Sequence, residues 1–277
     1  MYLNETPILS VSNLIVRYGD GCPSCHSFME KNRCTACGSV WAANNLSFDV
    51  YPGEVLGIVG ESGSGKTTLM RTLYFDFLPT SGSALLRDYK GGAKNMWEAS
   101  PAERRTIKDS VMGMVYQNPI FGLRMEYSAA SNIAEKIIAA GNRNAGQMTV
   151  RAKELLSAVE IPISRMSEPP KNFSGGMQQR VQISKALANN PAIILLDEVT
   201  TGLDLSVQAK VLDLIRKIKA RYGVSILLVS HDLAVIRMLA DRTIVMLDGK
   251  IAESGLTDQI LEDPQHPYTQ QLVHSLL

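Results

Sequence analysis

Short apolar runs alternate with longer segments of helical spacing along most of the chain. The runs that predict strands cover residues 9–17, 46–50, 55–59, 111–116, 193–196, 225–229 and 243–247. The segment 206–221 carries an apolar stripe at helical spacing, which predicts a helix packed on a sheet. That stripe is formed by Val207, Val211, Leu214 and Ile218. Strands that alternate with helices predict an α/β fold around a largely parallel sheet.

The middle of the chain differs, because its apolar positions follow helical spacing without strand patterns between them. We expect residues 119–190 to form a helical subdomain inserted in the α/β core, within one domain that spans residues 1–277. The apolar stripes of two predicted helices in this region are Ile133, Ile137 and Ile138 on one, and Leu155, Leu156 and Val159 on the other.

Composition and charge favour a globular protein without a membrane span. With 277 residues and 45% hydrophobic residues, the chain can build a sizeable core. Its formal net charge is +1, with acids and bases interspersed. The chain therefore has no strong positive electrostatic field that would attract a polyanion, which makes nucleic acid an unfavoured partner.

The longest apolar runs, 192–196 and 225–229, are shorter than the roughly 18 to 20 residues that cross a bilayer. Residues 1–6 lack a signal-peptide pattern, so we expect a cytoplasmic protein without direct membrane insertion.

The strongest chemical motif follows the predicted strand 55–59. Residues 60–68 fit the phosphate-binding pattern G-x-x-x-x-G-K-[ST], between a strand and an apolar helix. In this pattern backbone N–H groups point at phosphate oxygens, Lys66 contacts the β- and γ-phosphates, and Thr67 holds Mg²⁺. A glycine-rich turn without chemistry is the alternative, which the flanking strand and helix disfavour. The candidate nucleotide-binding residues are Gly60, Ser62, Gly63, Ser64, Gly65, Lys66, Thr67 and Thr68.

Two acids end the apolar strand 193–196. Asp197, at the carboxyl end of a strand, is placed to bind Mg²⁺ through a water molecule. Glu198 is placed to orient or deprotonate the attacking water in a phosphoryl transfer. The plainer alternative is that both acids begin a solvated loop, but the phosphate-binding motif favours the catalytic interpretation.

A further motif, in addition to the two described above, makes the chain resemble the ATP-binding cassette family. Residues 173–180 are similar to that family's signature motif, in which a serine and a glycine backbone bind the γ-phosphate of ATP held by the partner protomer. The resemblance gives this contact to Ser174, Gly175 and Gly176, at the start of a predicted helix. Met177 stands where the family usually has glutamine. The resemblance implies a P-loop nucleotide-binding fold, ATP hydrolysis, and a homodimer that encloses two nucleotides.

Four more positions match motifs of the family. Gln117, after the strand 111–116, matches the Q-loop glutamine, which senses Mg²⁺ and the γ-phosphate. His231 matches the switch histidine, which contacts the γ-phosphate, and Asp204 matches the D-loop aspartate at the dimer seam. Tyr18 matches the aromatic residue that stacks on adenine, although a tyrosine packed in the core at a strand end is the alternative. Val199 stands where the family commonly has proline.

A finer resemblance is to the ATP-binding subunits of bacterial carbon–phosphorus lyase systems, which accompany a phosphonate-degrading core complex. It rests on the stretches 122–124 with 132–133, 159–162 and 201–204. In transporters the surface after Gln117 receives a permease helix, and the resemblance implies that here it docks on soluble lyase core subunits. The alternative is the ATP-binding subunit of an oligopeptide- or nickel-type importer, since residues 263–269 are shared with oligopeptide importers.

All four cysteines lie in one segment, which the better-known family members lack. They form two C-x-x-C pairs separated by eight residues, a spacing that suits a tetrahedral Zn²⁺ ion. In a cytosolic protein such pairs more often bind metal than form disulfides, although an unliganded or redox pair is the alternative. Four thiolates leave no open coordination position, so the metal would be structural. The predicted ligands are Cys22, Cys25, Cys34 and Cys37, with His26 a less favoured substitute.

Residues 20–45 are therefore predicted to form an inserted zinc-binding hairpin, similar to a zinc ribbon, near the adenine site. Contact with a partner is its expected purpose. Because a zinc insert also occurs in DNA-repair ATPases, a zinc-containing nucleic-acid-binding ATPase is a second alternative. The bases Lys31 and Arg33 are balanced by Asp20 and Glu30, which disfavours a nucleic-acid surface.

Overall fold

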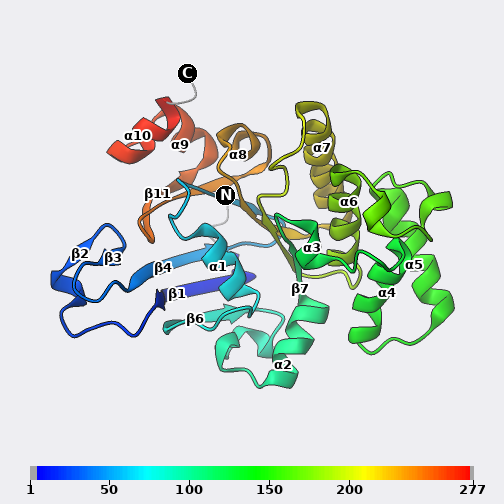
Figure 1. Cartoon of the computed structure of the whole chain (residues 1–277), viewed down its shortest axis with the longest axis horizontal. Helices are drawn as coiled ribbons and strands as arrows, with labels where there is room; N and C mark the ends of the chain where they lie inside the picture. Colours follow the sequence, from blue (N-terminus) through cyan, green and yellow to red (C-terminus); the bar gives the residue numbers. More distant parts are fainter. Residues whose placement is uncertain (1–4, 275–277) are drawn as a thin grey trace. The chain divides into compact units, whose positions relative to one another are not determined.

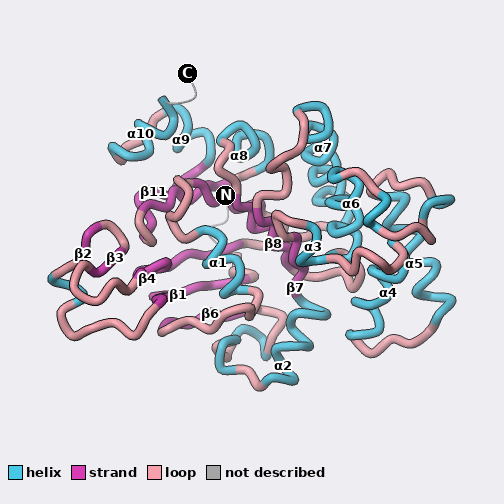
Figure 2. Tube along the Cα trace, viewed as in Figure 1, coloured by secondary structure: helices cyan, strands magenta, loops and turns pink. Residues whose placement is uncertain are grey.

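The chain, known from a computed structural model that describes residues 5–274, divides into two compact units. We call residues 1–100 with 228–277 the first unit, and residues 101–227 the second unit. Figures 1 and 2 show the helices and strands of both. Most of the stretch 1–6, from which the absence of a signal peptide was predicted, lies outside the described residues. Among the described helices, none combines the length and the apolar character needed to cross a bilayer.

The first unit contains an antiparallel sheet that the sequence patterns did not predict. Its strands, in spatial order, are β2 (Met29–Glu30), β3 (Arg33–Cys34), β4 (Val40–Val50), β1 (Leu9–Tyr18) and β6 (Ser81–Leu86). The predicted run 46–50 covers only the end of β4. The prediction was short because the polar residues Asn44 and Asn45 interrupt the apolar pattern of this strand. Leu14 pairs with Leu46 and Ile15 with Asn44, so Asn45, at φ +63°, forms a β-bulge.

A parallel strand pair in the first unit holds the phosphate-binding motif. Strand β5 (Val55–Val59) pairs in parallel with β10 (Arg242–Leu247), and β11 (Lys250–Leu256) pairs antiparallel with β10. All five residues of β5 are buried, as its continuous apolar run predicts. Helix α8 (Leu233–Leu239) packs on β5, and α9 (Thr257–Glu262) and α10 (Pro267–His274) pack on β11. Helix α1 (Lys66–Leu73) begins directly after the phosphate-binding glycines.

The second unit is mostly helical around two parallel strands, β7 (Met112–Val115) and β8 (Ile193–Asp197). The helices before and after β7 are α2 (Pro101–Thr106), α3 (Pro119–Gly122), α4 (Ala129–Ala139), α5 (Ala145–Ala158) and α6 (Gly175–Ala186). Helix α6 packs on β7 and contacts α4 and α5. The predicted stripe on α4 was wrong at Ile138, which is 47% exposed, while Ile133 and Ile137 are buried. A separate subdomain over 119–190 stays a prediction.

Helix α7 (Leu205–Tyr222) and strand β9 (Ser225–Val229) complete the second unit and lead into the first. The Asp204 carboxylate caps α7 by accepting from the N–H of Val207 at 3.0 Å, and Gly223 ends the helix at φ +61°. Of the predicted stripe, Val211, Leu214 and Ile218 are buried and Val207 is half-buried. The confirmed class is α/β, with an unpredicted antiparallel sheet.

Candidate nucleotide-binding and metal sites

The loop 60–68, which we call the phosphate loop, closes around the ammonium group of Lys66. The Lys66 Nζ donates to the carbonyls of Gly60 and Glu61, both at 2.7 Å, and the side chain is 5% exposed. A Cβ on Gly60 would stand 2.1 Å from the Met246 carbonyl oxygen, and a Cβ on Gly65 would stand 1.9 Å from that of Ala42. Only glycine fits these two positions, so the loop is shaped by contacts with β10 and β4 as well as by its own turns.

Two tyrosines contact the phosphate loop. Tyr268 of α10, which is buried, accepts a hydrogen bond from the N–H of Glu61 to its hydroxyl at 2.8 Å, and burial raises the pKa of this tyrosine. No role was predicted for Tyr268 from the sequence, because no local pattern connects it with Glu61, which lies 207 positions earlier in the chain. Tyr18 is 43% exposed and its hydroxyl lies 3.1 Å from Oγ1 of Thr68, so its ring is accessible next to the loop.

The predicted catalytic acids follow β8 in the second unit. Asp197 is 3% exposed at the end of the strand, and Glu198 has φ +47°, a left-handed backbone that is strained for a residue other than glycine. The Glu198 Oε2 accepts from Gln117 Nε2 at 3.0 Å and from the Thr201 hydroxyl at 3.2 Å. The structure therefore brings Gln117 and Glu198, two of the predicted catalytic residues, into direct contact.

The turn after Glu198 is stable without the proline that the family commonly has. Val199 is 1% exposed, so its side chain is fixed by packing. The N–H of Thr201 donates to the Glu198 carbonyl at 3.1 Å, and that of Leu203 to the Thr200 carbonyl at 3.2 Å. Burial of valine and two backbone hydrogen bonds thus restrict this turn.

Two buried glutamines of α6 hold the segment that carries Gln117. Gln182 accepts from the N–H of Tyr116 at 2.6 Å and donates to the carbonyl of the same residue at 3.1 Å. Gln179 donates to the Gln117 carbonyl at 2.9 Å, and the two glutamine side chains bond each other at 3.0 Å. Neither role was predicted from the sequence. The pattern that could have indicated them is the presence of two polar residues on the core-facing side of a predicted helix.

Replacing Gln182 with leucine is expected to lower the free energy of unfolding by about 1 to 3 kcal/mol. Leucine removes the acceptor for the buried N–H of Tyr116, and losing a buried partner costs about this much. Urea unfolding followed by circular dichroism measures the change. Gln147→Leu, at an exposed position of α5, is the control and should change stability by less than about 0.5 kcal/mol.

The signature residues begin helix α6. Ser174 is its N-cap, exposed, with Oγ accepting from the N–H of Met177 at 3.4 Å. Gly176 is buried, and a Cβ there would meet Val207 Cγ1 at 2.4 Å. The Met177 sulfur, in place of the usual glutamine, lies 3.5 Å from Nη1 of Arg165. The exposed serine and the free amides of a helix start make a surface that favours anions.

Asp204 and His231 occupy exposed positions at helix starts. Asp204 already caps α7, and the hydrogen bond from the N–H of Val207 holds its pKa below the ordinary aspartate value. Its capping role is structural and does not depend on a dimer. His231 is exposed between β9 and α8, where Asp232 caps the helix by accepting from the N–H of Ala234 at 2.8 Å. Tyr18, the phosphate loop and His231 belong to the first unit, whereas Gln117, the signature residues, Asp197, Glu198 and Asp204 belong to the second.

The four cysteines converge within the hairpin 22–39, which we call the metal hairpin. Their sulfur atoms all lie within 4.8 Å of one another, and three Sγ–Sγ distances are 3.6, 3.7 and 3.8 Å. A tetrahedral Zn²⁺ with bonds of about 2.3 Å places its sulfurs about 3.8 Å apart, whereas a disulfide needs about 2.05 Å. The arrangement therefore fits four-sulfur zinc coordination. Hydrogen bonding to Ser39 lowers the pKa of Cys37 to about 6, while burial raises that of Cys22 to about 12.

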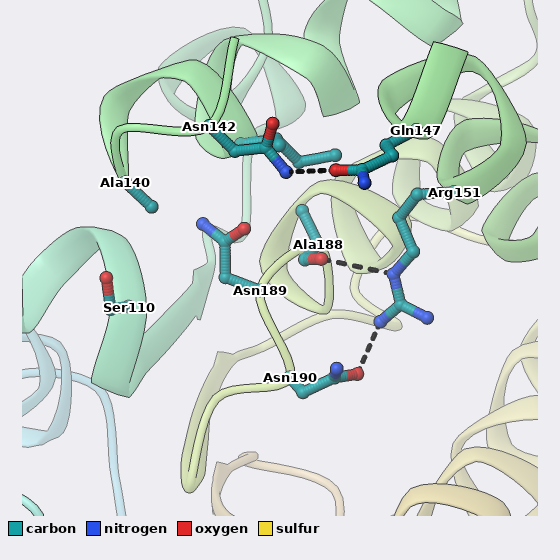
Figure 3. A pocket seen from close by; sticks show the side chains of 9 residues that line it. Ser110, Ala140, Asn142, Gln147, Arg151, Ala188, Asn189 and Asn190 are labelled. Atoms are coloured by element: carbon teal, nitrogen blue, oxygen red, sulfur yellow. Dashed lines mark hydrogen bonds between the residues drawn. The ribbon is translucent and has the colours of Figure 1, made fainter. Parts of the chain in front are cut away.

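A cavity of about 450 Å³ in the second unit contains none of the predicted site residues (Figure 3). Its polar groups bond one another: Arg151 donates to Asn190 and to the Ala188 carbonyl, and Asn142 donates to Gln147 at 3.0 Å. Arg151, the cation in its lining, is also ion-paired with Glu154 at 2.8 Å, so its charge is already balanced within the protein.

The chain belongs to the ATP-binding cassette family and is an ATPase of that class: the family model described as ABC transporter matches residues 43–201. A curated relative, the phosphonates utilization ATP-binding protein PhnK of Escherichia coli (strain K12), is 43% identical over 98% of both chains. The glutathione import ATP-binding protein GsiA of Escherichia coli O157:H7 is 38% identical over 84% of this chain, which corresponds to 38% of GsiA. The predicted family and its finer resemblance are confirmed.

Solved structures of ATP-binding cassettes share the fold. The dimeric post-hydrolysis structure of the cassette MJ0796 bound to ADP and Pi superposes with a TM-score of 0.74 and is 28% identical, over 90% of this chain and 98% of that one. The cbiO1 protein of Clostridium perfringens, part of the transporter complex cbiONQ, gives a TM-score of 0.76 at 23% identity, covering 94% of this chain and 92% of that one. The latter likeness supports the fold alone.

Proposed function

We propose that the chain binds Mg²⁺-ATP as a homodimer and hydrolyses it. Lys66 and the amides of the phosphate loop bind the phosphates, Thr67, Asp197 and Gln117 hold Mg²⁺, and Tyr18 stacks on adenine. Glu198 activates water and His231 contacts the γ-phosphate. These roles follow from the family and are supported by the Gln117–Glu198 hydrogen bond and the accessible ring of Tyr18.

Dimerisation completes this proposed site. The signature residues Ser174, Gly175 and Gly176 bind the γ-phosphate of the ATP held by the partner protomer, with Asp204 at the seam. The exposure of Ser174 and Gly175 and the dimeric structures of MJ0796 support this proposal. A homodimer is needed because the serine acts across the interface.

The proposed biological role is to support phosphonate catabolism by docking on the core subunits of a carbon–phosphorus lyase complex in the cytoplasm. The observation that carries it is the 43% identity with PhnK over nearly the whole of both chains. GsiA, an import protein, is less similar and matches this chain over only 38% of its own length. ATP hydrolysis on such a complex gates or remodels it rather than moving a solute.

An apolar surface after Gln117 is the proposed docking site. Ile120 and Phe121 of α3 are 62% and 75% exposed, and Tyr127 in the following loop is 61% exposed. Three large apolar side chains this close in sequence, and this exposed, are typical of an interface. Tyr127 also lines a cavity of about 580 Å³, together with Arg124, Ser131, Asn132, Ala134, Glu135 and Ile138.

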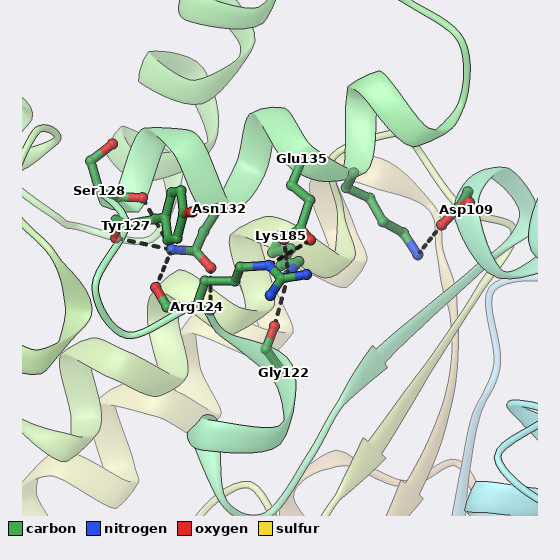
Figure 4. A network of polar contacts seen from close by, with 9 residues as sticks. Asp109, Gly122, Arg124, Tyr127, Ser128, Asn132, Glu135 and Lys185 are labelled. Atoms are coloured by element: carbon green, nitrogen blue, oxygen red, sulfur yellow. Dashed lines mark hydrogen bonds and ion pairs between the residues drawn. The ribbon is translucent and has the colours of Figure 1, made fainter.

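This docking surface is held in place by a polar network (Figure 4). Asn132, fully buried, accepts from the N–H of Arg124 at 2.8 Å and donates to the carbonyls of Arg124 and Tyr127 at 3.0 and 3.2 Å. Glu135 bonds Arg124 at 3.1 Å and Lys185 of α6 at 2.8 Å. Burial raises the pKa of Glu135, but the bonds from Lys185 and Arg124 outweigh it and hold this pKa below its usual value. The loop is therefore ordered before any partner binds.

The test is affinity capture from the native host in the presence of Mg²⁺ and ATP, with the captured subunits identified. The parent chain is expected to retain lyase core subunits, and Phe121→Asp to weaken that binding by roughly 30-fold or more, since an aromatic hot spot typically contributes 2 kcal/mol or more. Val150→Asp, at a 68% exposed apolar position of α5, is the matched control and should bind like the parent.

Other outcomes of the same capture would contradict the proposal. Recovery of a permease with a periplasmic binding protein would assign the chain to an importer. Salt-dependent retention of DNA would favour a nucleic-acid ATPase. Core subunits captured equally by parent and Phe121→Asp would leave the lyase role in place and refute the docking surface.

The metal hairpin is proposed to hold one structural Zn²⁺ per chain. The sulfur–sulfur distances support this, and the four thiolates Cys22, Cys25, Cys34 and Cys37 fill a tetrahedral site. Zinc would supply no open position for catalysis, so its role is to fold the hairpin. The side chain of His26 lies outside the described part of the structure.

A further inference from the structure

The metal hairpin contacts the phosphate loop directly. Asn32, in the turn between β2 and β3, donates from Nδ2 to the carbonyl of Gly63 at 3.4 Å. Gly63 has φ +85°, and no atom lies within 4 Å of the position a Cβ would take. This peptide therefore lies at the open rim of the loop, where the hairpin is placed to fix its orientation.

The orientation of this peptide matters for anion binding. The carbonyl of Gly63 and the N–H of Ser64 belong to one trans peptide group and point in opposite directions. A donor that fixes the carbonyl therefore also fixes the N–H of Ser64, which bonds the Glu61 carbonyl at 3.2 Å across a turn of the loop. Asn32 thereby restrains the turn 61–64, whose shape sets the direction of the loop amides that a phosphate would meet.

A second connection runs through β4. The N–H of Trp41 donates to the Asn32 carbonyl at 2.7 Å, which ties the hairpin turn to the first residues of this strand. The next residue, Ala42, presents the carbonyl that excludes any side chain at Gly65. The hairpin turn and the phosphate loop thus both contact one short piece of β4, so a shift of this piece displaces both.

The hairpin depends on its sulfur ligands for order. Its strands β2 and β3 have two residues each, too few to be stable alone. Its buried apolar cluster consists of Cys25, Cys34 and Trp41, with Ile15, Cys22 and Met29 at the margin. Because three of these six residues are proposed zinc ligands, metal binding supplies the cohesion that a larger core would otherwise provide.

We propose that metal in the hairpin and nucleotide on the phosphate loop stabilise each other, with Asn32 as the positioning residue that joins the two sites. The inference rests on the proposed zinc site. Linkage is reciprocal: if zinc raises the affinity for nucleotide by some factor, nucleotide raises the affinity for zinc by the same factor. One exposed hydrogen bond and an ordered turn correspond to a factor of about three to ten.

The experiment measures binding of ATPγS with Mg²⁺ to the full-length chain by calorimetry, with zinc bound and after removal of zinc by a chelator under reducing conditions. The zinc-loaded parent is expected to bind about three- to tenfold more tightly than the stripped parent. Asn32→Ala should keep its zinc and show a clearly smaller difference in ATPγS affinity between the two forms, since only the backbone connection through Trp41 remains. Ser24→Ala, at an exposed hairpin position that is not a sulfur ligand, is the matched control and should behave like the parent.

A reciprocal measurement needs no hydrolysis. Transfer of zinc to a chromogenic chelator should be slower with ATPγS present for the parent and Ser24→Ala, and ATPγS should slow it much less for Asn32→Ala. Equal ATPγS affinity of zinc-loaded and stripped parent, with one zinc per chain, would overturn the coupling and leave the zinc site intact. An Asn32→Ala variant that retained the full difference would overturn the role of Asn32. A parent chain without zinc would refute the zinc site and the coupling together.

Discussion

Replacing Glu198 with glutamine is expected to leave ATP binding intact and to slow hydrolysis by roughly 10² to 10⁴-fold, the usual contribution of a general base. Glutamine has nearly the same shape and keeps an oxygen that accepts from Gln117 and Thr201, so the turn should persist. It cannot take a proton from water. Phosphate release measures the rate, and calorimetry measures the affinity for ATP.

A chain that binds but does not hydrolyse ATP should accumulate as a closed dimer. Light scattering with Mg²⁺-ATP is expected to show a dimer for Glu198→Gln and mostly monomer without nucleotide. Glu262→Gln, on a surface glutamate that pairs with Arg237, is the control and should hydrolyse ATP at the parent rate. If Glu198→Gln also matched the parent rate, Glu198 would not be the base.

Replacing Cys34 with serine is expected to remove zinc from the protein, from one ion per chain to almost none. Cys34 is fully buried and its sulfur lies 3.8 Å from that of Cys22, so no other side chain can take its place without rearrangement of the hairpin. Structural zinc binding contributes apparent free energies of about 10 to 16 kcal/mol, so the loss of one thiolate should weaken it by orders of magnitude. Elemental analysis of purified protein measures the metal.

Acid should have a similar effect on the parent chain. Zinc binds the four sulfur atoms as thiolates, so protons compete with the metal, and zinc is expected to be lost as the pH falls. Ser24→Ala should keep zinc under all conditions where the parent does. Full zinc occupancy in Cys34→Ser would contradict four-cysteine coordination.

The strands that the patterns predicted best are those buried on both faces. Runs 55–59 and 225–229 match β5 and β9 in length, because a continuous apolar run needs no partner to be recognised. Strand β6 was missed because Ser81-Gly82-Ser83 has the composition of a turn and becomes a strand by pairing with β1. The polar stretch Asn44-Asn45 likewise enters β4 only because the opposite strand accommodates a bulge.

The chemistry of the site was local in sequence and therefore predictable. Glycine spacing around Lys66, two acids after an apolar strand, and paired C-x-x-C motifs each need only a few adjacent residues, so the nucleotide and metal candidates were available before any fold. The spacing of the cysteines also implied that one ion could join them, although not which residues would surround it.

The sequence by itself determined the class of protein and indicated the candidate phosphate-binding residues and metal ligands, because each is specified by residue type at short spacing. Only the tertiary structure decided what supports them: Tyr268 on the loop that carries Lys66, Gln182 on the segment that carries Gln117, and Asn32 on Gly63. These supports are side-chain hydrogen bonds between residues distant along the chain. Their geometry depends on where separate strands and helices end, which no local pattern encodes.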